Sequence, residues 1–521
     1  MKEMVPHGLA HVRQTIHVRV RRYNPDTEQT YLEPFTVQVY PGARVINVLQ
    51  AIKDQDSTFM FRMSCEAGQC GSCAVHVNGS PVLACTWPAS DGDLIEPLNL
   101  PIIRDLMVDL ACSIAKIPKI QTAAMGCQKE CHTECHENEC HTVCHGECQE
   151  NISSVPHVVP SFEETKEIKE LAECLNCLCC VSACPAVKVV DFAGPTAMRG
   201  YMRIALDPRE KWDRIRDAIT DGLFTCTTCQ QCATVCPKHI KTPGKAIEKL
   251  RAIASESDLT LPRHREILHL IERTGRSVEP SNKVFLDLVD EIIEPYGEVL
   301  EEVVFFVGCM FNARLVDTAL DMVEVMRHHG VRLIIPKDQI CCGSPLIRTG
   351  QRSPLQSIME QNVEALSIGI PTVMTMCAGC GSTLKHDYEH LDLPFVVKDV
   401  CEVMTEFGIK PDKKLNISAT YHDPCHLLGG QGISEEPRAL LSAAVDRFID
   451  MPAQCCGSGG GVKAGQPHEA AALGELRREM IRETGADIVV TVCPFCEYHL
   501  AEHSDKPVKN LLTIYRELLK S

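Results

Sequence analysis

The residues of this sequence that could do chemistry are its cysteines, and "AQCCGSGGG", residues 453–461, raises the sharpest question. Cys455 and Cys456 are adjacent, so both side chains cannot point into one ordinary apolar core, and a disulfide between neighbours is strained. The glycines that follow allow a turn that presents both sulfurs to one polynuclear centre. The alternative is a glycine-rich surface loop with a chance pair of cysteines.

The pair belongs to an internal repeat of five cysteines. The spacing around it is C-x29-CC-x36-C-x2-C, and about 115 residues earlier the chain reads C-x31-CC-x34-C-x2-C. Two sets in the same order argue against a chance loop. The first cysteine set is Cys309, Cys341, Cys342, Cys377 and Cys380, and the second cysteine set is Cys425, Cys455, Cys456, Cys493 and Cys496.

Five thiolates exceed the four ligands that a cubane cluster needs. A set of five could bridge irons in an unusual cluster and leave one iron able to meet an incoming sulfur, which is the chemistry of making and breaking disulfides. Each repeat alternates β-rich runs such as "VVFFVGC" and "ADIVVTVC" with helical stretches such as "NARLVDTALDMVEVMRHHG". This alternation predicts α/β folds with the cysteines at the carboxyl ends of strands.

A third pattern lies near the amino terminus, in "SCEAGQCGSCAVHVNGSPVLACTW". The order C-x4-C-x2-C with one later cysteine is the plant-type [2Fe–2S] spacing. Residues 14–40 alternate apolar and polar positions around an Asn-Pro-Asp turn, which predicts a β-hairpin, and "RVINVLQAIKDQ" has helical spacing. The predicted cluster ligands are Cys65, Cys70, Cys73 and Cys85.

Two further runs, "CLNCLCCVSACP" and "CTTCQQCATVCP", each read C-x2-C-x2-C-x3-C-P. In this ferredoxin motif the fourth cysteine serves the other cluster. The residues between the runs have helical periodicity, which predicts an α-helical domain. Cys179 is extra, and we interpret it as a small buried side chain. The predicted [4Fe–4S] ligand sets are Cys174, Cys177, Cys180 and Cys236 for one cluster and Cys226, Cys229, Cys232 and Cys184 for the other.

Composition limits the possible functions. The chain has 521 residues and 31 cysteines, which in a chain this long favours metal or redox chemistry over a disulfide scaffold. No run has the length of a membrane span or a signal peptide, so we expect a cytoplasmic protein without a membrane anchor. The net charge of −17 argues against nucleic-acid binding. An anionic substrate would need a local basic pocket.

The segment "CQKECHTECHENECHTVCHGEC", residues 127–148, combines cysteines with histidines. On helices, fourth-neighbour spacing would stack each C-x3-C-x3-C triplet along one face, and a helical hairpin could then offer six thiolates to a metal. An additional iron–sulfur cluster, zinc or another thiolate-bound metal, and a metal-free insertion all remain open. The candidate ligands are Cys127, Cys131, Cys135, Cys140, Cys144 and Cys148.

Residues 14 to about 245 resemble the iron–sulfur subunits of succinate dehydrogenase and fumarate reductase, in the hairpin, "SCEAGQCGSCAVHVNG", "PIIRDLMVDL" and "GPTAMRGY". In that family the second helical motif commonly lacks a cysteine and carries a [3Fe–4S] cluster beside a quinone site. Here Cys226, Cys229 and Cys232 are all present, which argues against a three-iron cluster.

Residues 300–521 resemble the catalytic subunit of heterodisulfide reductase, in "GCM", "CCGSP", "CAGC", "DPCHL", "CCGSGGG" and "CPFC". That resemblance implies a noncubane [4Fe–4S] cluster at each cysteine set. The fusion of both parts resembles the thiol:fumarate reductases of methanogenic archaea. The resemblance implies that coenzyme M and coenzyme B are oxidised to their heterodisulfide at the carboxyl-terminal half. Electrons would then pass through two [4Fe–4S] clusters and one [2Fe–2S] cluster to FAD in a separate flavoprotein subunit that reduces fumarate to succinate.

Both coenzymes carry anionic groups, so we expect Arg or Lys in the thiol pocket. Arg348, Lys385 and Lys463 lie just beyond cluster cysteines and are candidates, with a solvated surface charge as the alternative. His422 and His426 flank Cys425 and are candidate proton carriers or ligand partners, with a structural role as the alternative.

The expected fold is a multidomain α+β chain. It comprises a β-grasp [2Fe–2S] ferredoxin domain (1–110), a Cys/His-rich insertion (111–160), an α-helical ferredoxin domain (161–255), a helical connector (256–300) and two α/β cysteine-rich CCG domains (301–414 and 415–521). Two other functions stay open. One is a succinate dehydrogenase-type subunit that transfers electrons to a quinone or to another heterodisulfide reductase-like carrier. The other is a non-catalytic electron carrier.

Overall fold

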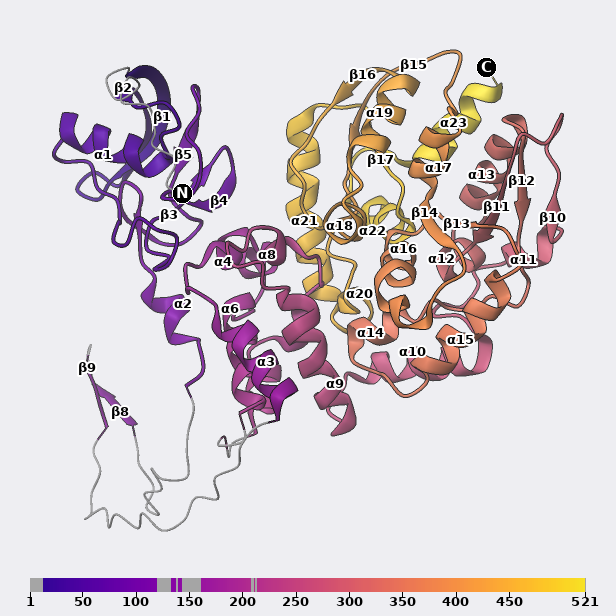
Figure 1. The fold of residues 1–521 in the computed structure, drawn as a ribbon, viewed down its shortest axis with the longest axis horizontal. Helices are drawn as coiled ribbons and strands as arrows, with labels where there is room; N and C mark the ends of the chain where they lie inside the picture. The colour runs from indigo at the N-terminus through magenta and orange to yellow at the C-terminus, as the bar shows by residue number, and fades with distance from the viewer. Residues whose placement is uncertain are drawn as a thin grey trace, which may run out of the picture.

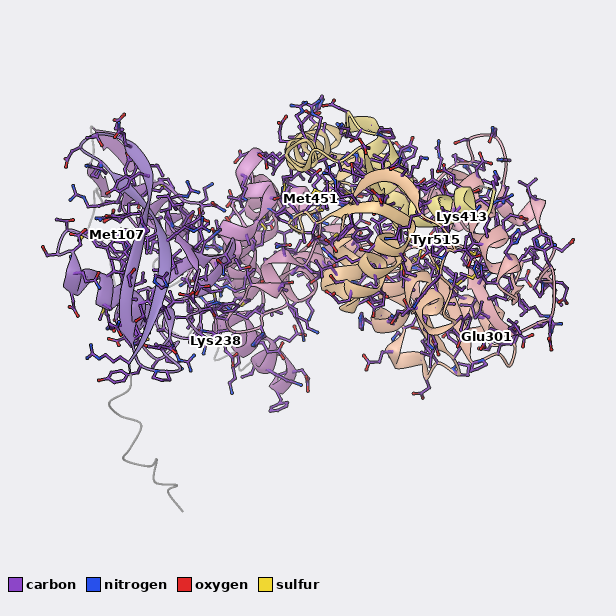
Figure 2. The ribbon with its side chains drawn as sticks, turned by 90° about the horizontal axis from the view of Figure 1, so that it is seen from above. Met107, Lys238, Glu301, Lys413, Met451 and Tyr515 are labelled. Atoms are coloured by element: carbon purple, nitrogen blue, oxygen red, sulfur yellow. The ribbon has the colours of Figure 1, made fainter. Side chains whose placement is uncertain are left out.

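The computed structural model describes residues 13–119, 133–136, 139–142, 161–207, 210 and 213–520, and only the backbone of 133–136 and 139–142. The amino-terminal domain lies at one end, a helical domain follows, and two cysteine-rich units form the other end (Figure 1). Figure 2 shows the same order from above, with Met107 in the first domain, Lys238 in the second, and Glu301 and Tyr515 in the cysteine-rich half.

The amino-terminal domain is a five-stranded sheet covered by one helix. Strands β1 (Gln14–Asn24) and β2 (Gln29–Val39) form the expected antiparallel hairpin, and helix α1 (Val45–Gln55) matches the predicted helical run. The sheet order is β2-β1-β5-β3-β4, with β3 (Ala74–Val77), β4 (Ser80–Leu83) and β5 (Leu94–Glu96). Alternate residues Ile16, Val18 and Val20 of β1 pack with the buried face of α1, so burial follows the period of two.

Beyond the sheet, β6 (Ile102–Arg104) and β7 (Met107–Val108) pair, and α2 (Ala111–Ala115) leads away from the domain. The helical domain then contains no strand within residues 161–256 that the structure describes, as predicted. Its helices are α3 (Phe162–Ala172), α4 (Cys179–Ala183), α5 (Pro185–Val189), α6 (Pro195–Ala205), α7 (Arg214–Thr220), α8 (Gln231–Thr234) and α9 (Glu248–Glu256).

The Cys/His-rich segment differs from expectation where the structure describes it. Strands β8 (Thr133–His136) and β9 (Glu139–Thr142) pair antiparallel, with Cys135 opposite Cys140. The helical stacking expected there is therefore wrong for these residues, because a strand directs successive side chains to opposite faces instead of aligning every fourth one. Cys127, Cys131, Cys144 and Cys148 lie outside the described residues.

Each cysteine-rich unit is a mainly parallel sheet with helical crossovers. The first sheet has the order β10-β12-β11-β13-β14, with β10 (Ile292–Ile293), β11 (Glu301–Phe306), β12 (Val331–Ile334), β13 (Thr372–Thr375) and β14 (Val396–Asp399). Its helices are α12 (Cys309–Ala313), α13 (Val316–His328), α14 (Ser344–Thr349), α15 (Leu355–Leu366), α16 (Ala378–Ser382) and α17 (Val400–Glu406).

The second unit repeats this arrangement with four parallel strands in the order β16-β15-β17-β18. The strands are β15 (Leu415–Tyr421), β16 (Val445–Ile449), β17 (Ile488–Thr491) and β18 (Val508–Asn510). The helices are α18 (Cys425–Gln431), α19 (Glu435–Ala444), α20 (Val462–Gly465), α21 (Pro467–Thr484), α22 (Pro494–His503) and α23 (Leu511–Lys520). Each cysteine group follows the carboxyl end of a strand, as predicted.

The two units share one hydrophobic core. Val303 and Phe305 of β11 pack in the same buried cluster as Tyr421 and Val490 of the second sheet, and α23 lies against α13 (Figure 1). Strands buried on both faces read as continuous apolar runs, which explains why these segments lack alternation.

The predicted helical connector is helical only in part. Helices α10 (Pro262–Thr274) and α11 (Phe285–Leu288) form, but β10 joins the first sheet by pairing with β12. Two β-branched residues beside an open strand edge favour this pairing over a helix. Among the residues described, no helix is both long enough and apolar enough to cross a membrane.

Candidate functional site

The amino-terminal cysteine loop has the geometry that a [2Fe–2S] cluster needs. Backbone N–H groups point toward its sulfurs: Gly68 donates to Cys85 Sγ at 3.3 Å, and Gln69 donates to Cys65 Sγ at 3.4 Å. Gly68 has a φ of 68°, a conformation that strains other residues. Such donors stabilise thiolate ligands, so the donor set fits the predicted cluster.

This loop packs directly against the helical domain. A Cβ placed on Gly71 would lie 2.8 Å from Cys177 Cβ and 3.0 Å from the Leu175 carbonyl oxygen. Across the same interface, His76 Nε2 lies 2.8 Å from Ser182 Oγ. Only a glycine allows the loop to approach Cys177 this closely, so the first two predicted cluster sites are neighbours.

The helical-domain cysteines lie in the crossed arrangement that the motifs predict. The thiols of Cys174, Cys180 and Cys236 interact electrostatically with one another, whereas Cys184 interacts with Cys226 and Cys229. Burial raises the pKa of the Cys180 thiol to about 12. A buried thiol with a high pKa deprotonates at neutral pH when a metal binds it, which fits a ligand role.

Cys179 lies apart from these sets. It is fully buried and packs in the core of the amino-terminal domain, in the same buried cluster as Val75 and Val77. This placement fits the interpretation of Cys179 as a small buried side chain.

The glycine run that follows Cys455 and Cys456 packs against the helical domain. A Cβ on Gly459 would lie 2.8 Å from the Thr227 carbonyl oxygen, and one on Gly460 would lie 2.5 Å from that of Cys226. Cys455 Sγ donates to Thr227 Oγ1 at 3.4 Å. The glycines are therefore required by close backbone contact between the second cysteine set and the loop that carries Cys226.

The same junction brings two predicted cluster sites together. The thiol of Cys229 in the helical domain hydrogen bonds to that of Cys455, and Cys455 also interacts with Cys425. These contacts and the burial of Cys229 raise the pKa of its thiol well above the ordinary range.

One buried guanidinium joins the helical domain to both cysteine-rich units. Arg251 has no exposed surface and donates to four backbone carbonyl groups. It reaches Leu223 and Cys226 within the helical domain, Arg348 in the first unit at 2.7 Å, and Gly460 in the second at 2.9 Å. This residue carried no motif, and its role follows only from the packing.

A cavity of about 430 Å³ lies between the two cysteine-rich units. The sets also touch each other, because the thiols of Cys377 and Cys493 hydrogen bond. The cysteines that line the cavity are Cys309, Cys341, Cys342, Cys377 and Cys380 of the first set and Cys425, Cys456, Cys493 and Cys496 of the second. One ligand inside it could therefore meet both sets.

Neighbouring thiols favour thiolates within both sets. Hydrogen bonds from Cys341 and Cys380 lower the pKa of Cys342 well below its ordinary value. Hydrogen bonds from Cys455 and Cys496 do the same for the pKa of Cys456. Iron binds the thiolate form of cysteine, so the donor chemistry of both sets fits iron–sulfur clusters.

The first two basic candidates differ in their placement. Arg348 lines the cavity, but it is buried and its Nη atoms pair with Glu248 at 2.8 Å and with Asp387 at 3.0 Å. Its interpretation as a solvated surface charge is therefore wrong, and its charge is already balanced. Lys385 pairs with Glu402 and is not among the cavity residues.

Lys463 lines the cavity and is held by three partners. It pairs with Glu502, lies 3.0 Å from His499 Nδ1, and sits 5.1 Å from the centre of the Tyr498 ring. Arg314 also lines the cavity, although sequence reasoning did not single it out. Its side chain donates a 3.4 Å hydrogen bond to Ser281, and no carboxylate of the described residues pairs with it. No local motif marks Arg314.

The histidines beside Cys425 are both held by the fold. His426 lines the cavity, and its Nε2 lies 3.1 Å from the Thr228 carbonyl oxygen of the helical domain. His422 is fully buried and accepts a hydrogen bond at Nδ1 from Arg477 Nε at 3.0 Å.

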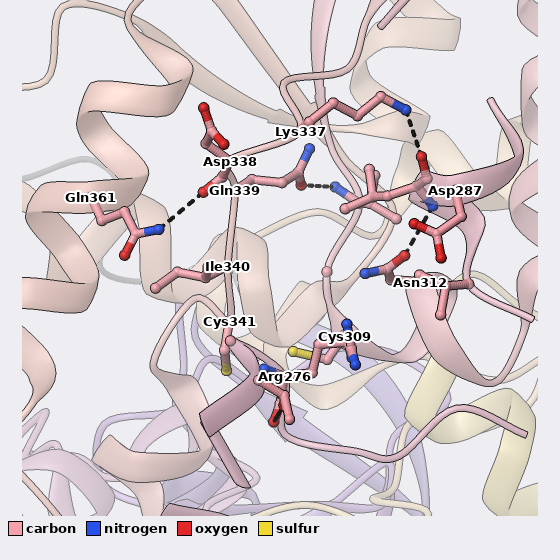
Figure 3. Close-up of a pocket in the computed structure, with 16 residues that line it drawn as sticks. Arg276, Asp287, Cys309, Asn312, Lys337, Asp338, Gln339, Ile340, Cys341 and Gln361 are labelled. Atoms are coloured by element: carbon pink, nitrogen blue, oxygen red, sulfur yellow. Dashed lines mark hydrogen bonds between the residues drawn. The ribbon is translucent and has the colours of Figure 1, made fainter. Parts of the chain in front are cut away.

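A second cavity of about 360 Å³ reaches the first cysteine set from the other side. Figure 3 shows Cys309, Cys341 and Arg276 near one end of this cavity, with Lys337 and Asp338 near the other. Because Cys309 and Cys341 line both cavities, the first set forms part of the wall between them.

Comparisons with known proteins agree with this architecture. A model of a 2Fe-2S iron-sulfur cluster binding domain matches residues 17–114, and a 4Fe-4S dicluster domain matches residues 170–240. A cysteine-rich domain matches twice, at residues 303–385 and 419–501. The multidomain α+β fold is therefore as predicted.

One relative covers nearly the whole chain. The fumarate reductase (CoM/CoB) iron–sulfur subunit of Methanothermobacter marburgensis is 40% identical over 503 residues, which span 94% of this chain and 95% of the relative. The chain belongs to this family. It is thus an iron–sulfur electron-transfer subunit of an oxidoreductase, and the predicted family is confirmed.

Two other relatives of this fumarate reductase family member each match a part of the chain. A dihydromethanophenazine:CoB--CoM heterodisulfide reductase subunit of Methanosarcina barkeri is 31% identical over 60% of this chain and 81% of its own length. The succinate dehydrogenase iron-sulfur subunit of Coxiella burnetii is 31% identical over 44% of this chain and 94% of its own length.

Proposed function

We propose that this chain oxidises two thiols, coenzyme M and coenzyme B, to their heterodisulfide and delivers the electrons to a flavoprotein subunit that reduces fumarate. The observation that carries the proposal is the cavity of about 430 Å³ that both cysteine sets line. Oxidation of two thiols forms one S–S bond and releases two protons and two electrons. Reduction of fumarate to succinate consumes two of each, so the two reactions balance.

The predicted ligand sets supply the route for the electrons. When bound, iron–sulfur clusters provide one-electron acceptors, here one [2Fe–2S], two cubane [4Fe–4S] and two noncubane [4Fe–4S] clusters. Contacts between the sets give the order: Cys455 beside Cys229, the two helical-domain sets side by side, and Cys177 against the Gly71 loop. We infer that FAD belongs to the partner subunit, which docks near the amino-terminal domain.

The cavity also supplies charge for anionic thiols. Arg314 from the first unit and Lys463 from the second line it. Arg314 has no carboxylate partner among the residues described, so its guanidinium is free to bind a sulfonate, phosphate or carboxylate group. We propose that the two cations orient the thiols with their sulfurs toward the cysteine sets.

Replacing one predicted ligand tests the proposal. Cys455→Ala in the full complex should lower thiol-dependent fumarate reduction by roughly 10²-fold or more, because it removes a sulfur at the junction with Cys229. Fumarate reduction driven by a dye that enters at the flavin should persist. Cys401→Ala is the matched control, since Cys401 is also fully buried but belongs to neither set. Full coupled activity in Cys455→Ala would contradict the proposal and favour a non-catalytic electron carrier.

A further inference from the structure

Two buried polar side chains stand beside the second cysteine set without an assigned role. His422 and Arg477 both have no exposed surface. The backbone N–H of His422 donates to the Val490 carbonyl at 2.8 Å, and its carbonyl accepts from Thr491 Oγ1 at 3.1 Å. The backbone of His422 is therefore fixed between β15 and β17.

The hydrogen bond from Arg477 determines the state of the imidazole. Arg477 Nε can only donate, so Nδ1 of His422 must be the unprotonated nitrogen that accepts. The ring is then neutral with its proton on Nε2. Nε2 is buried and has no hydrogen-bond partner among the described residues. It is a donor without an acceptor, which is costly in a protein interior.

Sulfur atoms lie where that donor needs an acceptor. One ring nitrogen of His422 and the Sγ atoms of Cys456 and Cys496 all lie within 4.8 Å of one another. Since Arg477 already occupies Nδ1, the nitrogen left for the sulfurs is Nε2.

Arg477 brings an unbalanced positive charge to the same place. Its Nη1 donates to the Pro452 carbonyl at 2.7 Å, and its Nη2 is buried without a partner among the residues described. The nearby carboxylate of Asp423 is held by both Nη atoms of Arg438, at 2.7 and 2.8 Å. A fully buried cation needs a counter-charge, and the thiols of the second set lie close enough to interact with it.

The first unit has neutral residues at the matching places. Phe306 precedes Cys309 by three positions, as His422 precedes Cys425, and it packs fully buried with the first cysteine set. Asn362 takes the place of Arg477 on the helix after the cysteine pair, and it donates to the Cys341 carbonyl at 3.1 Å. The donor and the charge therefore belong to the second unit alone in this comparison.

We propose that His422 and Arg477 are positioning residues for an iron–sulfur cluster at the second cysteine set. Arg477 holds the ring, Nε2–H donates to the sulfur of Cys456 or Cys496, and the guanidinium balances the negative charge of the centre. The inference rests on the proposed function. Hydrogen bonds to cluster sulfurs and nearby positive charge both favour the reduced form. The second set is therefore the better electron acceptor, directly before Cys229.

A redox titration of the full complex, followed by electron paramagnetic resonance, tests this proposal. His422→Phe copies the residue of the first unit and should leave the iron content unchanged. At a fixed potential the ratio of reduced to oxidised second cluster should fall about tenfold, which is about 59 mV for a one-electron couple. His422→Gln keeps an N–H donor and should recover part of this shift. His264→Gln is the control, because His264 is equally buried but bonds the Gly461 carbonyl.

The outcomes separate the two proposals. An unshifted potential in His422→Phe with intact iron would overturn the role of His422. A strong direct coupling from 15N-labelled histidine in nuclear double resonance would also overturn it, because that signal marks a ligand and not a donor. If His422→Phe loses iron, Arg477→Lys decides, since lysine keeps the charge but not the ring contact; a downward shift supports the proposal and an unchanged potential refutes it. Full coupled activity in Cys455→Ala would instead refute the proposed function.

Discussion

The two cysteine-rich units repeat one fold and one order of cysteines, yet they contact the helical domain differently. The first unit is joined by a buried ion pair, in which Arg348 meets Glu248 at 2.8 and 2.9 Å. The second is joined by backbone contact, because Gly459 and Gly460 bring it against the loop of Cys226. Repetition therefore duplicated the sulfur geometry, while the surroundings became specialised.

This difference gives the two sets different tasks in the proposed function. The second set lies against Cys229 and has His422 and Arg477 behind it. The first set lies across the shared cavity and packs with the apolar Phe306. Electrons produced in the cavity then leave through the second unit. Three substitutions test this division of roles, in order of decreasing effect.

The largest effect is expected at the residue that joins both units to the helical domain. Arg251→Met removes every donor to the carbonyls of Arg348 and Gly460 and leaves buried acceptors unsatisfied. We expect a loss of about 3–5 kcal/mol in the free energy of unfolding, measured by denaturant titration. Arg482→Met, which breaks only exposed ion pairs, should change it by less than about 0.5 kcal/mol. Equal losses in both variants would contradict the joining role.

A smaller effect is expected where the second unit alone contacts the helical domain. Gly460→Ala places a Cβ 2.5 Å from the Cys226 carbonyl oxygen at a φ of +64°. Relief of this clash should separate Cys455 from Cys229 and slow thiol-dependent fumarate reduction, which we expect to fall about tenfold, with about 1–3 kcal/mol of overpacking cost.

Gly485→Ala is the matched control for Gly460→Ala. Gly485 has a φ of +65° with nothing within 4 Å of its added Cβ, so it carries the same backbone strain without the clash. If both variants keep the same coupled rate, the glycine contact does not carry the electrons.

The smallest effect is expected at the cavity wall of the first unit. Arg314→Gln removes the guanidinium without a carboxylate partner among the described residues, and KM for one thiol should rise about tenfold, a loss of about 1.4 kcal/mol. Steady-state kinetics with each thiol varied separately would show which one Arg314 binds. Arg332→Gln, an exposed ion-paired arginine of the same unit, should leave KM unchanged. An unchanged KM in Arg314→Gln would remove the first unit from anion binding.

Local patterns predicted much of this molecule. The hairpin of residues 14–40, helix α1 and the strands before each cysteine group follow from periodicity, because burial on one face or on both leaves a regular trace in the sequence. The motif spacing also predicted that Cys184 would lie with Cys226 and Cys229, although some 40 residues separate them.

Other predictions failed where partners distant in the chain decide the outcome. Every fourth position in residues 133–142 suggested helices, but these residues pair as β8 and β9. Arg348 looked like a surface charge, yet Glu248, 100 residues away, holds it in the interior. A charged side chain gives no local sign of whether a distant counter-charge will bury it.

The sequence by itself determined the number, order and spacing of the cysteines, and so the family and the cluster types it points to, because ligand spacing is a local property of the chain. Only the tertiary structure decided that both cysteine sets line one cavity and that the second abuts Cys229. It also decided that the glycines after Cys456 serve an interface, and that His422 faces sulfur through a nitrogen fixed by Arg477. Each of these facts depends on the packing of one element against another, which no single stretch of sequence encodes.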